Sequence, residues 1–274
     1  MISETTADDV LSLFNVTDEA RSRFTAWRDD PKRRNTVVPH VLAHRTKVLY
    51  TVTPEEIYAI RDQIDPDNHA LGKVRRYEGE RVKQIVDWEP DFAFSHVFHY
   101  VLEAIGRVFT WKEFGEFCRT DSKARAMLYD PASKKNAEVA GEGCWSLLDA
   151  RKAMRWRIGN FYYSFIREIH VISQLRANGV DVQFHPLADA LFRVDAWCGR
   201  VALSLYVGNK KYRKGGHGRK FPPDAILSGA VPSFVFDSVE LAPADKFGVV
   251  HLVSEKEIRQ EAERLKAVTG RSES

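Results

Sequence analysis

Asp195 is the residue whose type and position point most directly to chemistry. It lies inside the apolar run 190–197, which has the length and composition of a β-strand. An unpaired carboxylate in such a strand is costly unless a metal, a cation or hydrogen bonds compensate for it. Asp195 is therefore a candidate site residue. The alternative is that it faces solvent or pairs with a neighbour such as Arg193.

A strongly basic segment follows this aspartate. No acidic residue occurs between Asp195 and Asp224, whereas seven basic residues do: Arg200, Lys210, Lys211, Arg213, Lys214, Arg219 and Lys220. Interspersed glycines predict a loop that can follow a phosphate backbone. A solvated surface loop is the alternative. The position of the segment, directly after the predicted strands around Asp195, favours contact with nucleic acid.

A long helix is predicted from Ser146 to Asn178, with Gly179 as its stop signal. Beyond its first turn it contains one acidic residue, Glu168. Aromatic and basic side chains are interleaved along it: Arg155, Trp156, Arg157, Phe161, Tyr162, Tyr163, Phe165 and Arg167. Such side chains can stack on bases. Their spacing of three and four residues favours packing within the protein instead.

A second basic region precedes this helix. Thr110 caps a short predicted helix, a turn follows near residues 119–120, and a second helix carries Lys123 and Arg125. Residues 133–143 are predicted to form a small hairpin. In this order the elements over 92–148 resemble a winged helix-turn-helix, which implies DNA contact through Lys123 and Arg125. Plain structural packing is the alternative.

Several other patterns speak against a metal cluster or a small-molecule site. His96 and His99 lie three apart on a predicted amphipathic helix, 91–107, but no third ligand follows at a recognisable spacing. The three cysteines are far apart and are expected to be free thiols. The sequence has no Walker lysine loop, no Gly-x-Gly-x-x-Gly after a strand and no Gly-x-Ser-x-Gly elbow.

Composition and length set the frame for these residues. The chain has 274 residues, is 44% hydrophobic and 29% charged, and has a net charge of +3, which is typical of a folded globular protein. It has no run of about 20 apolar residues for a membrane span, and no signal-peptide layout at its start. We therefore expect a cytoplasmic protein with no membrane partner. The length predicts two domains, a mostly helical one at 1–148 and an α/β one at 149–274.

The elements that must position Asp195 follow one another closely. After the long helix, the apolar runs 180–185, 190–197 and 201–207 are predicted strands, and 231–241 and 247–253 are two more. Ser254 and Glu257 form a capping box that opens a final helix to about residue 268. Short strands or buried extended pieces are also expected at 36–38 and 48–52.

Over roughly residues 150–268 this order resembles the restriction-endonuclease-like, or PD-(D/E)xK, nuclease core. The resemblance implies an α+β or α/β fold, with a mixed β-sheet flanked by helices. It matches Asp195 to the strand aspartate of the family and Glu168 to its helix acid. Together these carboxylates would hold Mg²⁺ or Mn²⁺, the kind of hard cation that assists phosphodiester hydrolysis.

The next strand departs from the family pattern. Where Glu-x-Lys is expected, the sequence has Ser204-Leu205-Tyr206, and Lys210 or Lys211, just past the strand, is the candidate for the missing amine. One hypothesis is a metal-dependent DNA endonuclease of a restriction, defence or mobile-element kind. The other is a non-catalytic DNA-binding or complex-assembly protein that retains a nuclease-like fold. DNA or RNA, and a homodimer or a partner protein, are left open.

Overall fold

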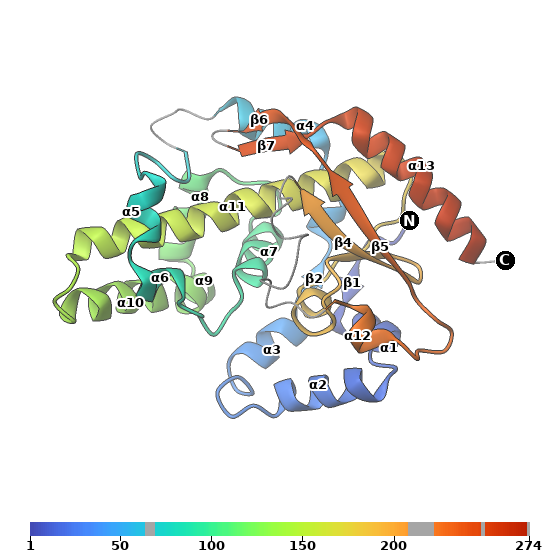
Figure 1. Ribbon diagram of the computed structural model, residues 1–274, viewed down its shortest axis with the longest axis horizontal. Helices are drawn as coiled ribbons and strands as arrows, with labels where there is room; N and C mark the ends of the chain where they lie inside the picture. The colour runs from blue at the N-terminus through green and yellow to red at the C-terminus, as the bar shows by residue number, and fades with distance from the viewer. Residues whose placement is uncertain (64–68, 208–221, 248–249, 273–274) are drawn as a thin grey trace. The chain divides into compact units, whose positions relative to one another are not determined.

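The computed structural model describes residues 1–63, 69–207, 222–247 and 250–272 (Figure 1). The chain has a mixed α and β fold that divides into two compact units. We call residues 1–54, 167–246 and 251–274 the sheet unit, and residues 55–166 and 247–250 the helical unit. This division differs from the predicted one at residue 148. Helix α11 (Leu147–Ala177) is continuous and is shared by both units, and the first 54 residues join the sheet unit.

The sheet unit contains a small mixed sheet of three strands. Strand β3 (Ala196–Cys198) pairs antiparallel with β4 (Val201–Val207), and β4 pairs parallel with β5 (Val235–Leu241). Gly199 has φ of +54° in the tight turn from β3 to β4, a conformation that glycine adopts without strain. Before β3, an isolated antiparallel bridge joins Gln183 to Trp197. The described path from β4 to β5 includes the short helix α12 (Asp224–Leu227).

Further elements of the sheet unit come from both ends of the chain. Two short strands, β1 (Thr5–Thr6) and β2 (Arg45–Thr46), pair with each other. Between them lie α1 (Ala7–Phe14), α2 (Asp18–Arg28) and α3 (Val37–Leu42), and η1 (Val48–Tyr50) follows β2. A separate pair, β6 (Pro243–Phe247) and β7 (Val250–Val253), precedes α13 (Glu255–Ser272). The predicted capping box at Ser254 and Glu257 is confirmed.

The core of the sheet unit gathers around Phe14. This ring is fully buried, and its centroid lies 5.3 Å from those of Trp197 and Phe234 and 5.8 Å from that of Phe192. Residues from the first helix, from the turn before β3, from β3 itself and from the approach to β5 therefore share one hydrophobic cluster.

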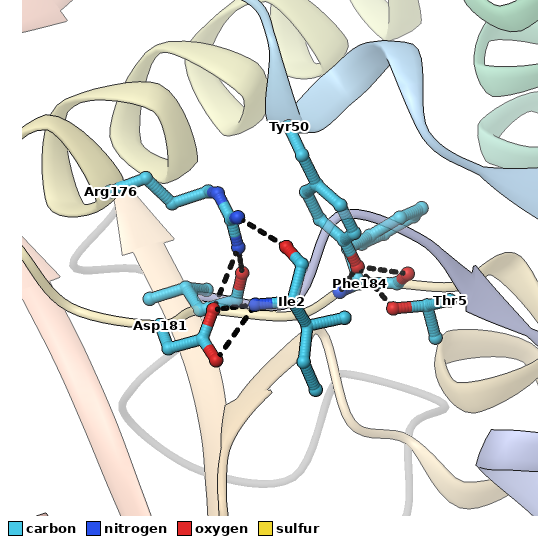
Figure 2. Close-up of polar contacts among 7 residues, drawn as sticks. Ile2, Thr5, Tyr50, Arg176, Asp181 and Phe184 are labelled. Carbon is cyan, nitrogen blue, oxygen red and sulfur yellow. Dashed lines mark hydrogen bonds and ion pairs between the residues drawn. The ribbon is translucent and has the colours of Figure 1, made fainter.

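Arg176, near the end of α11, connects the N-terminal segment to the segment that follows α11 within the sheet unit (Figure 2). Its side chain is 8% exposed and donates hydrogen bonds of 2.6 Å to the carbonyl oxygens of Ile2 and Val182. It also forms an ion pair of 3.2 Å with Asp181, whose carboxylate accepts the amide of Ile2 at 2.9 Å. The guanidinium lies 4.1 Å from the ring centroid of Tyr50. Its charge is thus satisfied within the protein.

Tyr50 completes this connection. Its hydroxyl donates to the carbonyl oxygen of Phe184 at 3.2 Å, accepts the amide of the same residue at 3.0 Å, and lies 2.6 Å from the hydroxyl of Thr5 (Figure 2). Burial raises the pKa of Tyr50 to about 12.

The helical unit has no strand apart from the residues it shares with β6 and β7, among those that the structure describes. It contains α4 (Pro54–Asp62), α5 (Arg76–Glu80), α6 (Lys83–Val86), α7 (Phe94–Ile105), α8 (Trp111–Thr120), α9 (Ser122–Ala124), η2 (Arg125–Tyr129), α10 (Asp130–Gly141) and the first part of α11. Aromatic rings form its core. Phe98 and Phe109 are buried, and each lies 5.4 Å from Phe165 of α11, centroid to centroid.

Several predicted strands are wrong. Residues 133–143 are not a hairpin, because they continue the helix α10, supported by an ion pair between Lys135 and Glu138 one turn apart. The valines at 37, 38 and 41 are buried on α3, so an apolar run that suits a strand is buried by a short helix instead. Residues 48–50 form the 3₁₀ turn η1. These runs are too short for periodicity to separate helix from strand.

The helices predicted over 91–107, from Thr110, around Lys123, over 146–178 and at the C-terminal end are confirmed, and the structure also has α1 and α2. Thr6, Thr17 and Thr110 each accept the backbone amide of the third residue of the helix that follows, as N-cap residues do. Gly179, with φ of +82°, follows the end of α11. None of the helices in the described part of the chain is long and apolar enough to cross a bilayer.

Candidate functional site

Asp195 lies immediately before β3, not within it, and is half-buried. Its amide donates to the carbonyl oxygen of Leu203 at 3.1 Å, and its carboxylate oxygen Oδ2 accepts the amide of Leu205 at 2.9 Å. Both bonds reach across to β4. The carboxylate is therefore held in a defined orientation by the backbone of the neighbouring strand.

The strand register places two serines in line with Asp195. Ala196 pairs with Leu203, so Asp195 stands opposite Ser204 on β4, and Ser204 pairs with Ser238 on β5. Residues in register on neighbouring strands project to the same face of a sheet. The position opposite Asp195, where the family resemblance calls for an acid, is thus occupied by a small hydroxyl side chain.

The segment that delivers Asp195 is irregular, although its sequence predicts a strand. Residues 188–192 form a π-helical turn, η3 (Ala188–Phe192), and Arg193 follows in the left-handed conformation with φ of +61°. The predicted strand over 190–197 is correct only for its last residues. The run has the apolar composition of a strand, and nothing in it signals a π turn.

His185 fixes the start of this irregular segment. Its ring is fully buried, accepts the amide of Leu187 at Nδ1 (3.1 Å), and lies 3.1 Å from the carbonyl oxygen of His44 through Nε2. These partners correspond to a neutral ring that carries its proton on Nε2. The histidine therefore positions the turn that leads to η3 and Asp195.

Glu168, the predicted second carboxylate, is half-buried on α11 and belongs to the sheet unit with Asp195. Among the described residues, no three His, Cys, Asp or Glu side chains are grouped so that they could hold a metal ion. The predicted metal site therefore rests on two carboxylates. That donor set suits Mg²⁺ or Mn²⁺, because such ions bind through one or two protein carboxylates and keep several waters.

The predicted basic loop lies outside the described residues. This applies to Lys210, the candidate for the catalytic amine, and to the five predicted phosphate contacts Lys211, Arg213, Lys214, Arg219 and Lys220. The sequence alone supports these assignments. Arg200, which precedes the loop, lies over the ring of Phe234 at 4.1 Å and donates to the carbonyl oxygens of Ser233 and Pro232.

Lys123 and Arg125 belong to the helical unit, whereas Asp195 and Glu168 belong to the sheet unit. Both basic residues are exposed near the start of a helical stretch that begins at Ser122. Arg125 forms a 3.0 Å ion pair with Asp130 and packs over the ring of Tyr129. A single residue, Asp121, links α8 to α9, and no strand follows within 122–148, so the predicted wing is absent from this described stretch.

The interleaved arginines of α11 turn out to be structural. Arg155 donates to the carbonyl oxygens of His69 and Ala70, and Arg157 donates to those of Ile85 and Val86. Burial lowers the pKa of Arg157 from its usual value. These guanidinium groups therefore hold residues 69–70 and the end of α6 against α11.

His96 and His99 are both buried on α7, stacked on Phe92 and edge-on to Phe165 respectively. This agrees with their interpretation as core histidines.

Comparisons of the chain with protein-family models, with curated proteins and with solved structures find no match. The geometry around Asp195 is therefore the basis on which function is argued.

Proposed function

We propose that this protein is a metal-dependent endonuclease of a restriction, defence or mobile-element kind that hydrolyses phosphodiester bonds of DNA, with Asp195 at its reaction centre. The observation that carries the proposal is the half-buried carboxylate of Asp195, held at the start of β3 by the amide of Leu205. A carboxylate fixed in this way is pre-organised to orient a cation or a water molecule.

The order of elements in the sheet unit supports the same proposal. Helix α11 with Glu168 is followed by the Gln183 bridge, by β3 and β4 in antiparallel pairing, by α12, and by β5 parallel to β4. The resemblance to the PD-(D/E)xK core implies a helix with an acid, three adjoining strands with the aspartate in the second, a further β-pair and a closing helix. Here the first of the three strands is reduced to the bridge at Gln183, and Asp195 lies just before the second.

The residues have separate roles in this proposal. Asp195 and Glu168 would hold Mg²⁺ or Mn²⁺, which neutralises charge on the scissile phosphate and lowers the pKa of the attacking water. The backbone amide of Leu205 keeps the Asp195 carboxylate oriented. Lys210 is proposed to stabilise developing negative charge, and Lys211 to Lys220 to grip the phosphate backbone.

A specific observation favours a second candidate, a non-catalytic DNA-binding or complex-assembly protein. Ser204 stands opposite Asp195 where an acid is expected, and the described residues contain no group of three metal-binding side chains. Two carboxylates without a third can mark a nuclease-like scaffold that has no chemistry. The two candidates make opposite predictions about cleavage.

Cleavage assays separate the candidates. Supercoiled plasmid, duplex and single-stranded DNA oligonucleotides and an RNA oligonucleotide are incubated with the full chain in Mg²⁺, Mn²⁺ or EDTA. The variants are Asp195→Asn, whose amide oxygen can still accept the Leu205 amide, and Glu168→Gln. Asp8→Asn is the matched control, because Asp8 is an exposed carboxylate of the same unit.

We expect metal-dependent DNA cleavage by the wild type and by Asp8→Asn, with loss of cleavage in Asp195→Asn and Glu168→Gln. Binding without cleavage in either metal would support the non-catalytic candidate. Cleavage by Asp195→Asn at the wild-type rate would remove Asp195 from the reaction. Cleavage restricted to RNA would correct the substrate class.

The basic segment has a test of its own. Replacement of Lys210, Lys211, Arg213 and Lys214 by glutamine should weaken DNA binding and flatten its salt dependence, by about 0.9 in log–log slope for each phosphate that is no longer neutralised. An unchanged slope would assign this charge to solubility.

A further inference from the structure

Arg193 has a backbone conformation that its residue type disfavours. It is the one residue other than glycine with positive φ among those the structure describes, at +61°. It also caps η3, whose i to i+5 hydrogen bond runs from the Arg193 amide to the carbonyl oxygen of Ala188. Left-handed non-glycine residues and short π turns are both rare, and both recur at functional sites. Here the two adjoin and lead directly into Asp195.

The side chain of Arg193 is unusual as well. The residue is half-buried, and its Nε atom is buried without a hydrogen-bond partner. Within the described part of the chain, its guanidinium makes no hydrogen bond or ion pair, and so it is not the partner of Asp195. A buried N–H donor without an acceptor is unfavourable for the folded protein, whereas the two Nη groups are not among the buried atoms.

Neither feature has a structural benefit that depends on arginine. Glycine is the residue that adopts φ near +60° without strain, and it would place no buried donor here. The other partly buried arginines near this point differ, because Arg176 donates to two carbonyl oxygens and an acid and Arg200 donates to two carbonyl oxygens. What arginine adds at position 193 is a free planar donor group.

We propose that Arg193 binds a phosphate group of the nucleic acid backbone beside Asp195. The Cα atoms of the two residues are at most about 7.6 Å apart, because two trans peptide units separate them. The guanidinium offers several donors in a planar fork that matches phosphate oxygens. A bound phosphate would supply acceptors for the two Nη groups, which have no acceptor among the described residues. The source of the phosphate as a nucleic acid backbone rests on the function proposed above.

Binding without cleavage tests this proposal. Fluorescence anisotropy of a labelled DNA duplex, titrated with the full chain in EDTA at several salt concentrations, gives the Kd and its salt slope. The variants are Arg193→Gln, which removes the charge, Arg193→Gly, which also relieves the backbone, and Arg193→Lys, which keeps the charge without the fork. Arg259→Gln is the matched control, an exposed arginine of the same unit.

We expect Arg193→Gln and Arg193→Gly to raise Kd about tenfold, as the loss of one charge-assisted hydrogen bond would, and to reduce the salt slope by about 0.9. Arg193→Lys should keep the slope and bind with intermediate affinity. The Tm of Arg193→Gly should equal or exceed that of the wild type. Arg259→Gln should bind like the wild type.

A folded Arg193→Gly variant with wild-type Kd and slope would overturn the proposal, as would a lower Tm with unchanged binding. Inorganic phosphate is added as a competitor to identify the source. Displacement of the duplex at low millimolar phosphate, lost in Arg193→Gln, would point to a free phosphate ligand and contradict a backbone contact.

The outcomes are separable from those for the proposed function. If Asp195→Asn abolishes cleavage while Arg193→Gln binds normally, the nuclease stands and the role of Arg193 fails. If the wild type never cleaves but Arg193→Gln flattens the salt slope, the phosphate contact stands and the nuclease fails.

Discussion

Arginine side chains in the helical unit and in the sheet unit differ in what they contact. In the helical unit, Arg155 and Arg157 each donate to two backbone carbonyl oxygens, and Arg125 pairs with Asp130. In the sheet unit, Arg193 is half-buried without a hydrogen bond or ion pair to the described residues. The sequence allows the arginines interleaved with aromatic rings on α11 to contact bases, but their spacing favours packing, and the contacts of Arg155 and Arg157 agree with packing.

The difference shows how a structural arginine can be told from one available for a ligand. Burial alone does not separate them, since Arg157 and Arg193 are both partly buried. The Nε atom of each is buried without a partner, so what separates them is the terminal Nη groups: Nη1 of Arg157 donates to two carbonyl oxygens, and neither Nη group of Arg193 has an acceptor among the described residues. By that criterion Arg125, Arg155 and Arg157 of the helical unit have structural roles, and we expect the chemistry beside Asp195 in the sheet unit.

The largest effect is expected from the aromatic core of the helical unit. Phe98 is 1% exposed and stacks at 4.5 Å on Phe114 and at 5.4 Å on Phe165. Phe98→Ala should lower the free energy of unfolding by about 3–5 kcal/mol, measured by urea denaturation. A loss below about 1 kcal/mol would contradict the view that these rings are core and not a base-stacking surface.

A smaller loss is expected from the arginine of the sheet unit that does have partners. Arg176→Ala would leave the carbonyl oxygens of Ile2 and Val182 without this donor and would remove the cation paired with Asp181. We expect a loss of about 2–4 kcal/mol in the free energy of unfolding. Arg193→Gly should show no such loss. Equal destabilisation by the two changes would contradict the view that Arg176 has a structural role and Arg193 does not.

Arg157→Gln tests whether an arginine of the helical unit is structural or contacts phosphate. It removes the bonds to the carbonyl oxygens of Ile85 and Val86 and should lower the free energy of unfolding by about 1–3 kcal/mol. The salt slope of DNA binding should be unchanged. A flattened slope in a folded Arg157→Gln variant would show that the helical unit also contacts phosphates.

The smallest effect is confined to alkaline pH. The pKa of Tyr50 is raised to about 12 by burial, and an unfolded tyrosine ionises near pH 10. The stabilisation is therefore complete below about pH 10 and is lost as the pH rises through about 12. Tyr50→Phe should lack this part of the alkaline loss, measured as the difference between the wild-type and variant unfolding free energies from pH 8 to 12. Parallel curves would place the hydroxyl in a solvated environment.

The sequence allowed the helices to be predicted far better than the approach to the site. Capping threonines and the glycine after α11 are local signals, and each marks an observed helix end. The π turn η3 and the left-handed Arg193 have no local signal, since they depend on the buried contacts of His185 and Phe192. The cost of a charge among apolar residues points to Asp195 from the sequence alone, whereas the sequence suggests Arg193 only as a partner of that aspartate.

Charge patterning also had a limited reach. Setting aside the six basic residues from Lys210 to Lys220, acidic residues outnumber basic ones in the rest of the chain. That observation predicts where phosphate contact is concentrated, but it does not reveal which single arginines elsewhere lack partners. Such information requires the hydrogen-bond geometry of the folded protein.

The most direct test of the central claim is the single-turnover rate of DNA cleavage in Mg²⁺ by Asp195→Asn, beside the double variant Lys123→Gln/Arg125→Gln of the helical unit. If Asp195 is at the reaction centre, we expect cleavage to be lost in Asp195→Asn with an unchanged Tm. The double variant should cleave bound DNA at the wild-type rate. Two results would contradict the assignment of the chemistry to the sheet unit. One is cleavage by Asp195→Asn at the wild-type rate, and the other is loss of cleavage in the double variant but not in Asp195→Asn.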